Sequence, residues 1–294
     1  MDSAHAEPVR FHEVALRDGL QNESTCLSPE KRAELAALMA LYGPSSLEVA
    51  AFVHPGKVPQ MAGAEALCEL LQGAPWREKV TLFGLVPNQR GFEVFSRAGL
   101  DGVTLLASAS ESHSQANVGQ SRPAAFQEAL TLVENAQSGE FLARAYVSMA
   151  FGCPFEGEIS PSVVVEMAQG FFEAGADVVV LADTLGGGTP EQVSQLVQDV
   201  LLACPGIPLG LHLHDGRQQA CESAGGAREL GVVHFDSALG GFGGCPFAPG
   251  AVGNLDTAKW ADFLQDRQEP VSLDFPALLK ASTVLGHALS TISS

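Results

Sequence analysis

The stretch "DVVVLADTLGGGTPEQVSQLVQDVLLA", residues 177–203, contains one complete copy of the pattern that decides the fold. Its aliphatic run predicts a buried strand over 177–183. A glycine-rich loop follows, and Thr189 and Pro190 then precede an amphipathic segment that ends at residue 203. Threonine before proline is typical of a helix N-terminus, because the hydroxyl accepts a backbone N–H and proline has none to satisfy. The stretch therefore predicts one strand–loop–helix unit.

The same unit recurs along the chain. Aliphatic or β-branched runs predict strands over residues 9–16, 45–53, 80–86, 102–108, 143–151, 177–183, 208–214 and 232–239. Amphipathic segments predict helices over residues 28–43, 88–99, 160–175 and 189–203, among others. Serine before proline begins two of these helices, and glycines that favour a left-handed C-cap follow several, at positions 43, 99, 175 and 231.

Eight such units, without a long linker or a shift in composition, predict a single domain over residues 1–294 with the α/β class of a (β/α)₈ TIM barrel. We expect the barrel over about residues 8–254 and additional C-terminal helices over about 255–290. A doubly wound open sheet is the alternative. The first strand is not followed by G-x-G-x-x-G, which counts against the dinucleotide-binding form of that alternative.

Composition narrows the class of protein. The chain has 294 residues, of which 46% are hydrophobic, and this favours a globular protein with a large core. A net charge of −18, with only 16 Lys and Arg, argues against nucleic acid and anionic membranes as partners. The N-terminal sequence is not typical of a secretion signal, and the six cysteines form no CxxC pair, so we expect a cytoplasmic protein with free thiols.

Polar residues at the ends of predicted strands indicate where the chemistry lies, because barrel active sites form at the carboxyl ends of the strands. Arg17 and Asp18 end the first strand in "EVALRDGLQNES", residues 13–24. His212 and His214 are two apart on the seventh strand, so their side chains share a face. With oxygens from Asp18 and Asn254, this set favours Mg²⁺ or Mn²⁺, with Zn²⁺ or Co²⁺ as alternatives.

Two carboxylates inside predicted strands need partners. Glu48 lies in "SLEVAAF", and Arg17 at the end of the neighbouring strand is the economical counter-ion. Glu13 shares the parity of Arg17 on the first strand. A purely structural ion network is the alternative for both glutamates. Asp183, at the end of the sixth strand, is placed to accept a hydrogen bond from a metal-binding histidine.

The segment "GGFGGCPFAPGAVGN", residues 240–254, contains six glycines and carries Cys245 at its centre. Such glycine density favours an adaptable loop. A buried, inert cysteine is the usual role of a single thiol. Above a metal site, however, a thiol on this loop is suited to proton transfer.

Taken together, these segments resemble the 3-hydroxy-3-methylglutaryl-CoA lyase family, metal-dependent TIM barrels related to the isopropylmalate synthases. The resemblance covers nearly the whole chain. It is carried by "RDGLQNE" (17–23), "FVHPGKVPQM" (52–61), "GCPFEG" (152–157), "LADTLGGGTP" (181–190), "HLHD" (212–215) and "GGFGGCPFAPGAVGNL" (240–255).

The resemblance implies a retro-Claisen cleavage of the acyl-CoA substrate to acetyl-CoA and acetoacetate, on a divalent ion, in a homodimer. Gln21 and Arg17 would contact the substrate. The implied metal ligands are Asp18, His212, His214 and Asn254.

The resemblance also implies catalytic roles. Arg17 would stabilise the enolate that forms on the thioester oxygen, and Cys245 would exchange a proton with the substrate. Glu48 and Asp183 would shape and polarise the site. His212 would be a proton shuttle only as a hypothesis, because a metal-bound imidazole cannot act freely as a base.

Several positions depart from the family pattern near the expected acyl pocket. Apolar residues replace hydroxyl-bearing ones on the second and sixth strands, and two further segments differ. These positions are Ala15–Leu16, Ala50, Ala51, Val180 and Gly216–Gln219. Because sites built for hydroxyl contacts discriminate strongly, the changes favour a different or larger acyl group, unless they are neutral.

Three other functions stay open on the sequence: a condensing enzyme of the synthase type, a pyruvate-dependent aldolase, and a metal-binding homologue without turnover. The cysteine loop favours the lyase over the synthases. Phosphates of CoA need local positive charge on this acidic chain, and Lys57, Arg90 and Arg217 are its candidate sources.

Overall fold

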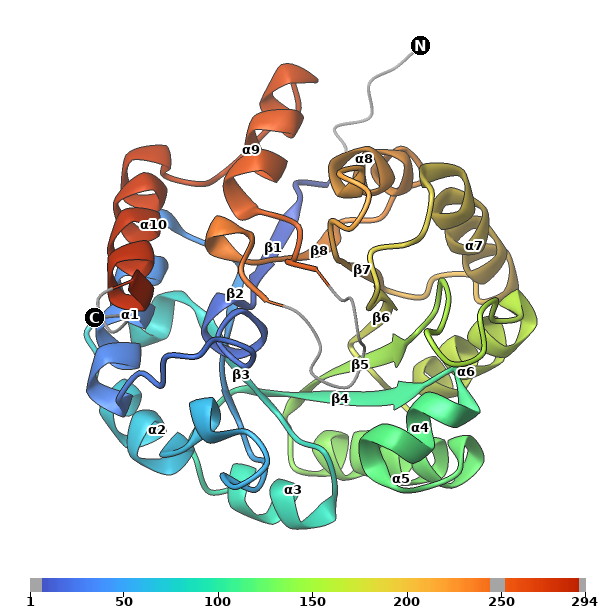
Figure 1. Ribbon diagram of the computed structural model, residues 1–294, viewed down its shortest axis with the longest axis horizontal. Helices are drawn as coiled ribbons and strands as arrows, with labels where there is room; N and C mark the ends of the chain where they lie inside the picture. The colour runs from blue at the N-terminus through green and yellow to red at the C-terminus, as the bar shows by residue number, and fades with distance from the viewer. Residues whose placement is uncertain (1–6, 244–251, 291–294) are drawn as a thin grey trace.

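The computed structural model describes residues 7–243 and 252–290, and its strands close into a parallel barrel in which β1 pairs with both β2 and β8 (Figure 1). The closed sheet confirms the TIM barrel and excludes the doubly wound alternative. The strands are β1 (Arg10–Glu13), β2 (Ser46–Ala51), β3 (Thr81–Leu85), β4 (Gly102–Ser108), β5 (Leu142–Ser148), β6 (Val178–Asp183), β7 (Leu209–Leu213) and β8 (His234–Ser237).

Helices surround the barrel, and α9 and α10 follow β8 as the expected C-terminal addition, with α10 packed against α1 (Figure 1). The helices are α1 (Pro29–Tyr42), α2 (Ala64–Gln72), α3 (Gln89–Phe95), α4 (Glu111–Val118), α5 (Arg122–Ser138), α6 (Pro161–Glu173), α7 (Pro190–Ala203), α8 (Ala220–Glu229), α9 (Thr257–Asp266) and α10 (Phe275–Ser290). Across the described part of the chain, no helix has the length and apolar character that a membrane crossing requires.

Helix starts follow the serine–proline and threonine–proline pattern. The Ser28 hydroxyl accepts from the backbone of Lys31 at the start of α1. Thr189 and Gln192 form a reciprocal capping box at the start of α7. Gly43 ends α1 in the left-handed region with φ 78°, as its position predicts.

The first strand is shorter than predicted, and this is a correction. β1 ends at Glu13, and residues Ala15–Gly19 form a π-helical turn. The buried Glu13 carboxylate accepts hydrogen bonds from the backbone N–H groups of Ala15 and Leu239, both at 2.9 Å, and from the Tyr42 and Thr257 hydroxyls. These contacts turn the chain out of the sheet, so Arg17 is not on the strand and the shared parity with Glu13 does not hold.

The main apolar core lies between the strands and the surrounding helices, where Phe11, Leu35, Phe171 and Trp260 are almost fully buried. The inside of the barrel is different, because it contains charged side chains. Arg144, His212 and Asp236 are all buried there. The fold therefore encloses a polar interior below the carboxyl ends of its strands, where the candidate site lies.

Candidate active site

The π-helical turn after β1 aims Arg17 at the neighbouring strand. Arg17 Nε donates to Glu48 Oε2 at 2.5 Å, and Arg17 Nη1 donates to Asp18 Oδ1 at 2.6 Å. The predicted Arg17–Glu48 pair is therefore present, and both residues are buried. Burial would lower the pKa of Arg17, but the carboxylates of Glu48 and Asp18 raise it overall, so the guanidinium stays charged.

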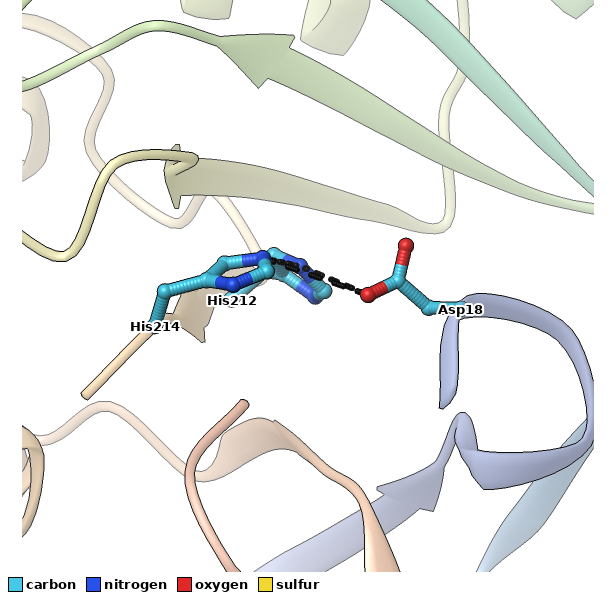
Figure 2. Close-up of side chains that lie close together, drawn as sticks. All are labelled: Asp18, His212 and His214. Atoms are coloured by element: carbon cyan, nitrogen blue, oxygen red, sulfur yellow. Dashed lines mark hydrogen bonds and ion pairs between the residues drawn. The ribbon is translucent and has the colours of Figure 1, made fainter. Parts of the chain in front are cut away.

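Asp18, in the π-helical turn after β1, and His212 and His214, at and just past the end of β7, converge as predicted (Figure 2). Their candidate ligand atoms lie within 4.8 Å of one another, and all three residues are buried. The two histidine Nε2 atoms are 3.1 Å apart. Asp18 Oδ2 lies 4.0 Å from Nε2 of His212 and 3.9 Å from Nε2 of His214.

The hydrogen bonds of the two imidazoles test whether this set fits a metal ion. His214 Nδ1 donates to the carbonyl oxygen of Val252, and His212 Nδ1 lies 3.0 Å from Asp236 Oδ2. Because both acceptors take the Nδ1 proton, two Nε2 lone pairs face the same space, which a proton or a cation must fill. Ligands about 2.1 Å from an octahedral ion lie roughly 3 to 4 Å apart, so the donor set fits a divalent ion.

Electrostatics support an anionic aspartate beside neutral imidazole. Burial would raise the pKa of Asp18, but Arg17 lowers it overall. Burial and the neighbouring His212 lower the pKa of His214 to about 4. Burial would also lower the pKa of His212, but its hydrogen bond to Asp236 and the charge of Asp18 raise it.

Asn254 lies beside this group, and its backbone forms an isolated antiparallel β-bridge with His214. Its amide nitrogen donates to Asp18 Oδ2 at 2.7 Å and to the Phe242 carbonyl at 2.8 Å. Coordination by its oxygen would need the amide to turn, and this ligand stays a prediction. Gln21 donates to Asp18 Oδ1 at 2.8 Å and lines the cavity above the site. Cys245 lies outside the described residues.

The Asp183 carboxylate does not accept from either imidazole, which corrects the sequence prediction. Its carboxylate accepts from the backbone N–H groups of Gly187 and Gly188, at 3.2 and 2.8 Å, and so folds the glycine-rich loop after β6. The carboxylate that receives His212 Nδ1 is Asp236, on the neighbouring strand β8. Sequence reasoning missed Asp236, although its place beside His212 follows from adjacent strands seven and eight.

A cavity of about 980 Å³ opens above these residues. Arg17, Asp18, His212 and His214 line its inner end, and Lys57 and Arg90 also line it. Glu65, Glu69 and Glu128 contribute acidic groups. Arg217 is not among the lining residues. The volume of the cavity is ample for an extended ligand of several hundred Å³.

Only some of the positions that depart from the family pattern line this cavity. Ala51 lines the cavity, whereas Ala50 and Val180 are fully buried and are not part of the lining. Val180 packs instead against Tyr146 and Ala182 inside the barrel. Residues 216–219 also lie outside the cavity wall. Most of these changes therefore alter packing or the surroundings and not the visible wall.

The chain is similar in sequence to a known family and to known enzymes over nearly its whole length. The HMGL-like family model matches residues 8–285. The chain is 37% identical over 290 residues to an (R)-citramalyl-CoA lyase from Chloroflexus aurantiacus, covering 96% of this chain and 92% of that protein. It is 35% identical to a hydroxymethylglutaryl-CoA lyase from Pseudomonas mevalonii, with 97% and 94% covered.

A solved structure of an HMG-CoA lyase from Acinetobacter baumannii, in complex with coenzyme A and 3-methylmalate, superposes with a TM-score of 0.90. That protein is 33% identical, and the match covers 98% of this chain and 93% of the other. The family match, these relatives and the shared barrel agree. The chain belongs to the HMGL-like family and is a carbon–carbon lyase of the hydroxymethylglutaryl-CoA lyase group.

Proposed function

We propose that the protein cleaves a 3-hydroxy-3-methylglutaryl-CoA-type thioester to acetyl-CoA and acetoacetate, with Mg²⁺ or Mn²⁺ held by Asp18, His212, His214 and the Asn254 amide oxygen. The observation that carries the proposal is a fixed guanidinium directly beside a convergent Asp–His–His set. Arg17 is tied through Nε and Nη1. Its Nη2 has no hydrogen-bond partner among residues 7–243 and 252–290, and it can donate to substrate.

Retro-Claisen cleavage needs a deprotonated alcohol and a stabilised enolate. When bound, the ion would orient the substrate hydroxyl and lower its pKa. As the C–C bond breaks, its electrons pass to the thioester carbonyl, and Arg17 would stabilise the enolate oxygen by a charged hydrogen bond. Glu48 keeps Arg17 in place for this role.

Proton transfers complete the cycle. Cys245 would protonate the enolate carbon and form the methyl group of acetyl-CoA. His212 would accept the hydroxyl proton only while its Nε2 is free of the ion. Gln21 would help to place the substrate, and Asp183 would shape the wall through the loop that it holds.

The thioester portion needs a long channel and positive charge. Lys57 and Arg90 are exposed residues of the cavity lining, and they are the candidates for contacts to CoA phosphates. The A. baumannii relative was solved with coenzyme A, which supports this ligand class. We also propose a homodimer, as the family resemblance implies.

A second substrate is favoured by a specific comparison. The 37%-identical relative is a citramalyl-CoA lyase. Citramalyl-CoA carries its carboxylate directly on the carbinol carbon, so the same cleavage would release pyruvate in place of acetoacetate. The site chemistry is common to both thioesters, and the difference is one methylene between the carbinol carbon and the carboxylate.

The test is a side-by-side cleavage assay of the two thioesters with Mg²⁺ or Mn²⁺, following acetyl-CoA and the released oxo acid. His214→Ala is the matched blank. Acetoacetate release that vanishes in the variant is the expected result. Pyruvate release alone would assign the second substrate, and no release of either from folded, metal-loaded protein would contradict the proposal.

A further inference from the structure

Asp236 stands at the centre of a hydrogen-bonded network that crosses the inside of the barrel. Its side chain is 1% exposed. Oδ1 accepts from Arg144 Nη2 at 2.6 Å, and Oδ2 accepts from the Tyr146 hydroxyl at 2.6 Å. The third partner is His212 Nδ1, at 3.0 Å from Oδ2.

We propose that Asp236 is a positioning residue for metal binding: it holds the His212 imidazole with its proton on Nδ1, so that the Nε2 lone pair faces the ion. This proposal depends on one part of the proposed function, the binding of a divalent ion, and not on the reaction. It concerns how strongly the ion is held, and its test therefore needs no substrate.

Adjacent strands set the distance between the two residues. His212 on β7 and Asp236 on β8 are register partners, and both side chains point into the barrel. The opposite tautomer would bring a bare Nδ1 to the carboxylate, where it would repel the oxygen, and a ring flip would place the Cδ2 carbon there and lose the hydrogen bond. The carboxylate thus selects one orientation and one tautomer of His212.

The opposite side of the barrel fixes the carboxylate itself. Arg144 and Tyr146 both belong to β5, which does not border β8 in the sheet. They occupy Oδ1 and Oδ2 from across the interior, and the Arg144–Asp236 ion pair is buried on both sides. Asp236 therefore cannot turn away from His212 without breaking charged hydrogen bonds.

The number of acceptors explains why a carboxylate is required. Three donors converge on Asp236, and only a group without its own protons accepts from all three. Asparagine has one acceptor oxygen, and its NH₂ group would face at least one donor. In Asp236→Asn the amide oxygen can still accept from His212 while Arg144 faces the NH₂ group, so an apolar residue is needed to remove the acceptor of His212.

The test is Mn²⁺ affinity, measured by EPR titration of the metal-free protein. Asp236→Leu, which has no acceptor for His212 Nδ1, should bind Mn²⁺ about 10- to 100-fold more weakly, as for other groups that orient metal ligands. Asp101→Leu is the matched control, because Asp101 also pairs with an arginine, Arg77, but lies away from the site. It should bind Mn²⁺ like the wild type.

Asp236→Leu leaves Arg144 buried without its counter-ion and could fail to fold, so Arg144→Met/Asp236→Leu serves as the second variant. It removes both charges and still leaves His212 Nδ1 without its acceptor, so it should show the same loss of Mn²⁺ affinity. A folded variant of either kind that binds within threefold of the wild type would overturn the inference.

NMR gives a second readout that a merely structural role would not produce. The wild type should show a slowly exchanging Nδ1–H proton of His212, identified by its loss in His212→Gln. Its absence in the wild type would overturn the inference even if neither Asp236 variant folds. If the lyase assays fail while both readouts hold, only the proposed function is rejected.

Discussion

The two histidines of the candidate metal site are held by different parts of the molecule. His212 Nδ1 donates to the carboxylate of Asp236, a residue on a barrel strand that is 1% exposed. His214 lies just past the end of β7 and donates to the backbone of Val252, a residue that is 36% exposed. One half of the site is therefore held by the barrel and the other by a loop.

This difference teaches how the same residue type can be fixed in two ways. The barrel-held half depends on a side chain, and a single substitution can remove it. The loop-held half depends on a carbonyl oxygen that every residue possesses, so only a displacement of the backbone can remove it. Asp18 joins the halves, since it contacts both Arg17 and Asn254.

Removal of the shared carboxylate should have the largest effect. Asp18→Asn should weaken Mn²⁺ binding by more than about 100-fold, beyond the range for groups that only orient ligands. Isothermal titration with Mn²⁺ measures the change. Asp183→Asn is the comparison, because the Asp183 carboxylate binds the glycine loop and neither imidazole. Equal losses in the two variants would show that the site is not centred on Asp18.

Disturbance of the loop-held half should have a smaller effect. Gly243 has φ +131°, and a Cβ atom there would lie 2.0 Å from Asn254 Nδ2 and 3.0 Å from Asp18 Oδ2. Gly243→Ala should displace Asn254 and weaken Mn²⁺ binding by roughly tenfold, in the range seen for lost supporting contacts.

Gly187→Ala is the control for Gly243→Ala, because a Cβ at Gly187 meets nothing within 4 Å. It should leave Mn²⁺ affinity unchanged. Unchanged affinity in Gly243→Ala itself would mean that the loop does not support the ion.

The barrel-held half should also show a distinctive pH dependence of stability. Burial and the nearby Arg144 lower the pKa of His234, beside Asp236 on β8, to about 3. An unfolded histidine has a pKa near 6.5. Between these values only the unfolded chain takes up this proton, so His234 destabilises the fold as pH falls from about 6.5 towards 3.

His234→Gln should remove up to roughly 1.4 kcal/mol per pH unit from the acid slope of the unfolding free energy. Urea titrations at pH 4.5 to 7 measure that slope. His54→Gln, at an exposed position, should leave it unchanged. Parallel slopes in wild type and His234→Gln would contradict the lowered pKa.

Local sequence patterns were sufficient to predict the barrel, the Arg17–Glu48 ion pair and the paired histidines of the site. Strand and helix periods are properties of neighbouring residues, and capping by Thr189 needs only its own helix. The Arg17–Glu48 pair was predictable because a buried carboxylate demands a cation from the next strand. His212 and His214 share a face for the same simple geometric reason.

Contacts between distant residues explain what the sequence did not predict. The turn after β1 depends on Glu13 contacts with Tyr42, Leu239 and Thr257, which no local pattern brings together. Asp183 was expected to face a histidine, but the N–H groups of its own glycine loop take its oxygens.

Coordination of one Mn²⁺ ion by both His212 and His214 is tested most directly by electron spin-echo modulation of the bound ion. We expect couplings from two imidazole nitrogens in the wild type, and from one in either His212→Gln or His214→Gln. Mn²⁺ bound to the wild type without any imidazole nitrogen coupling would contradict it.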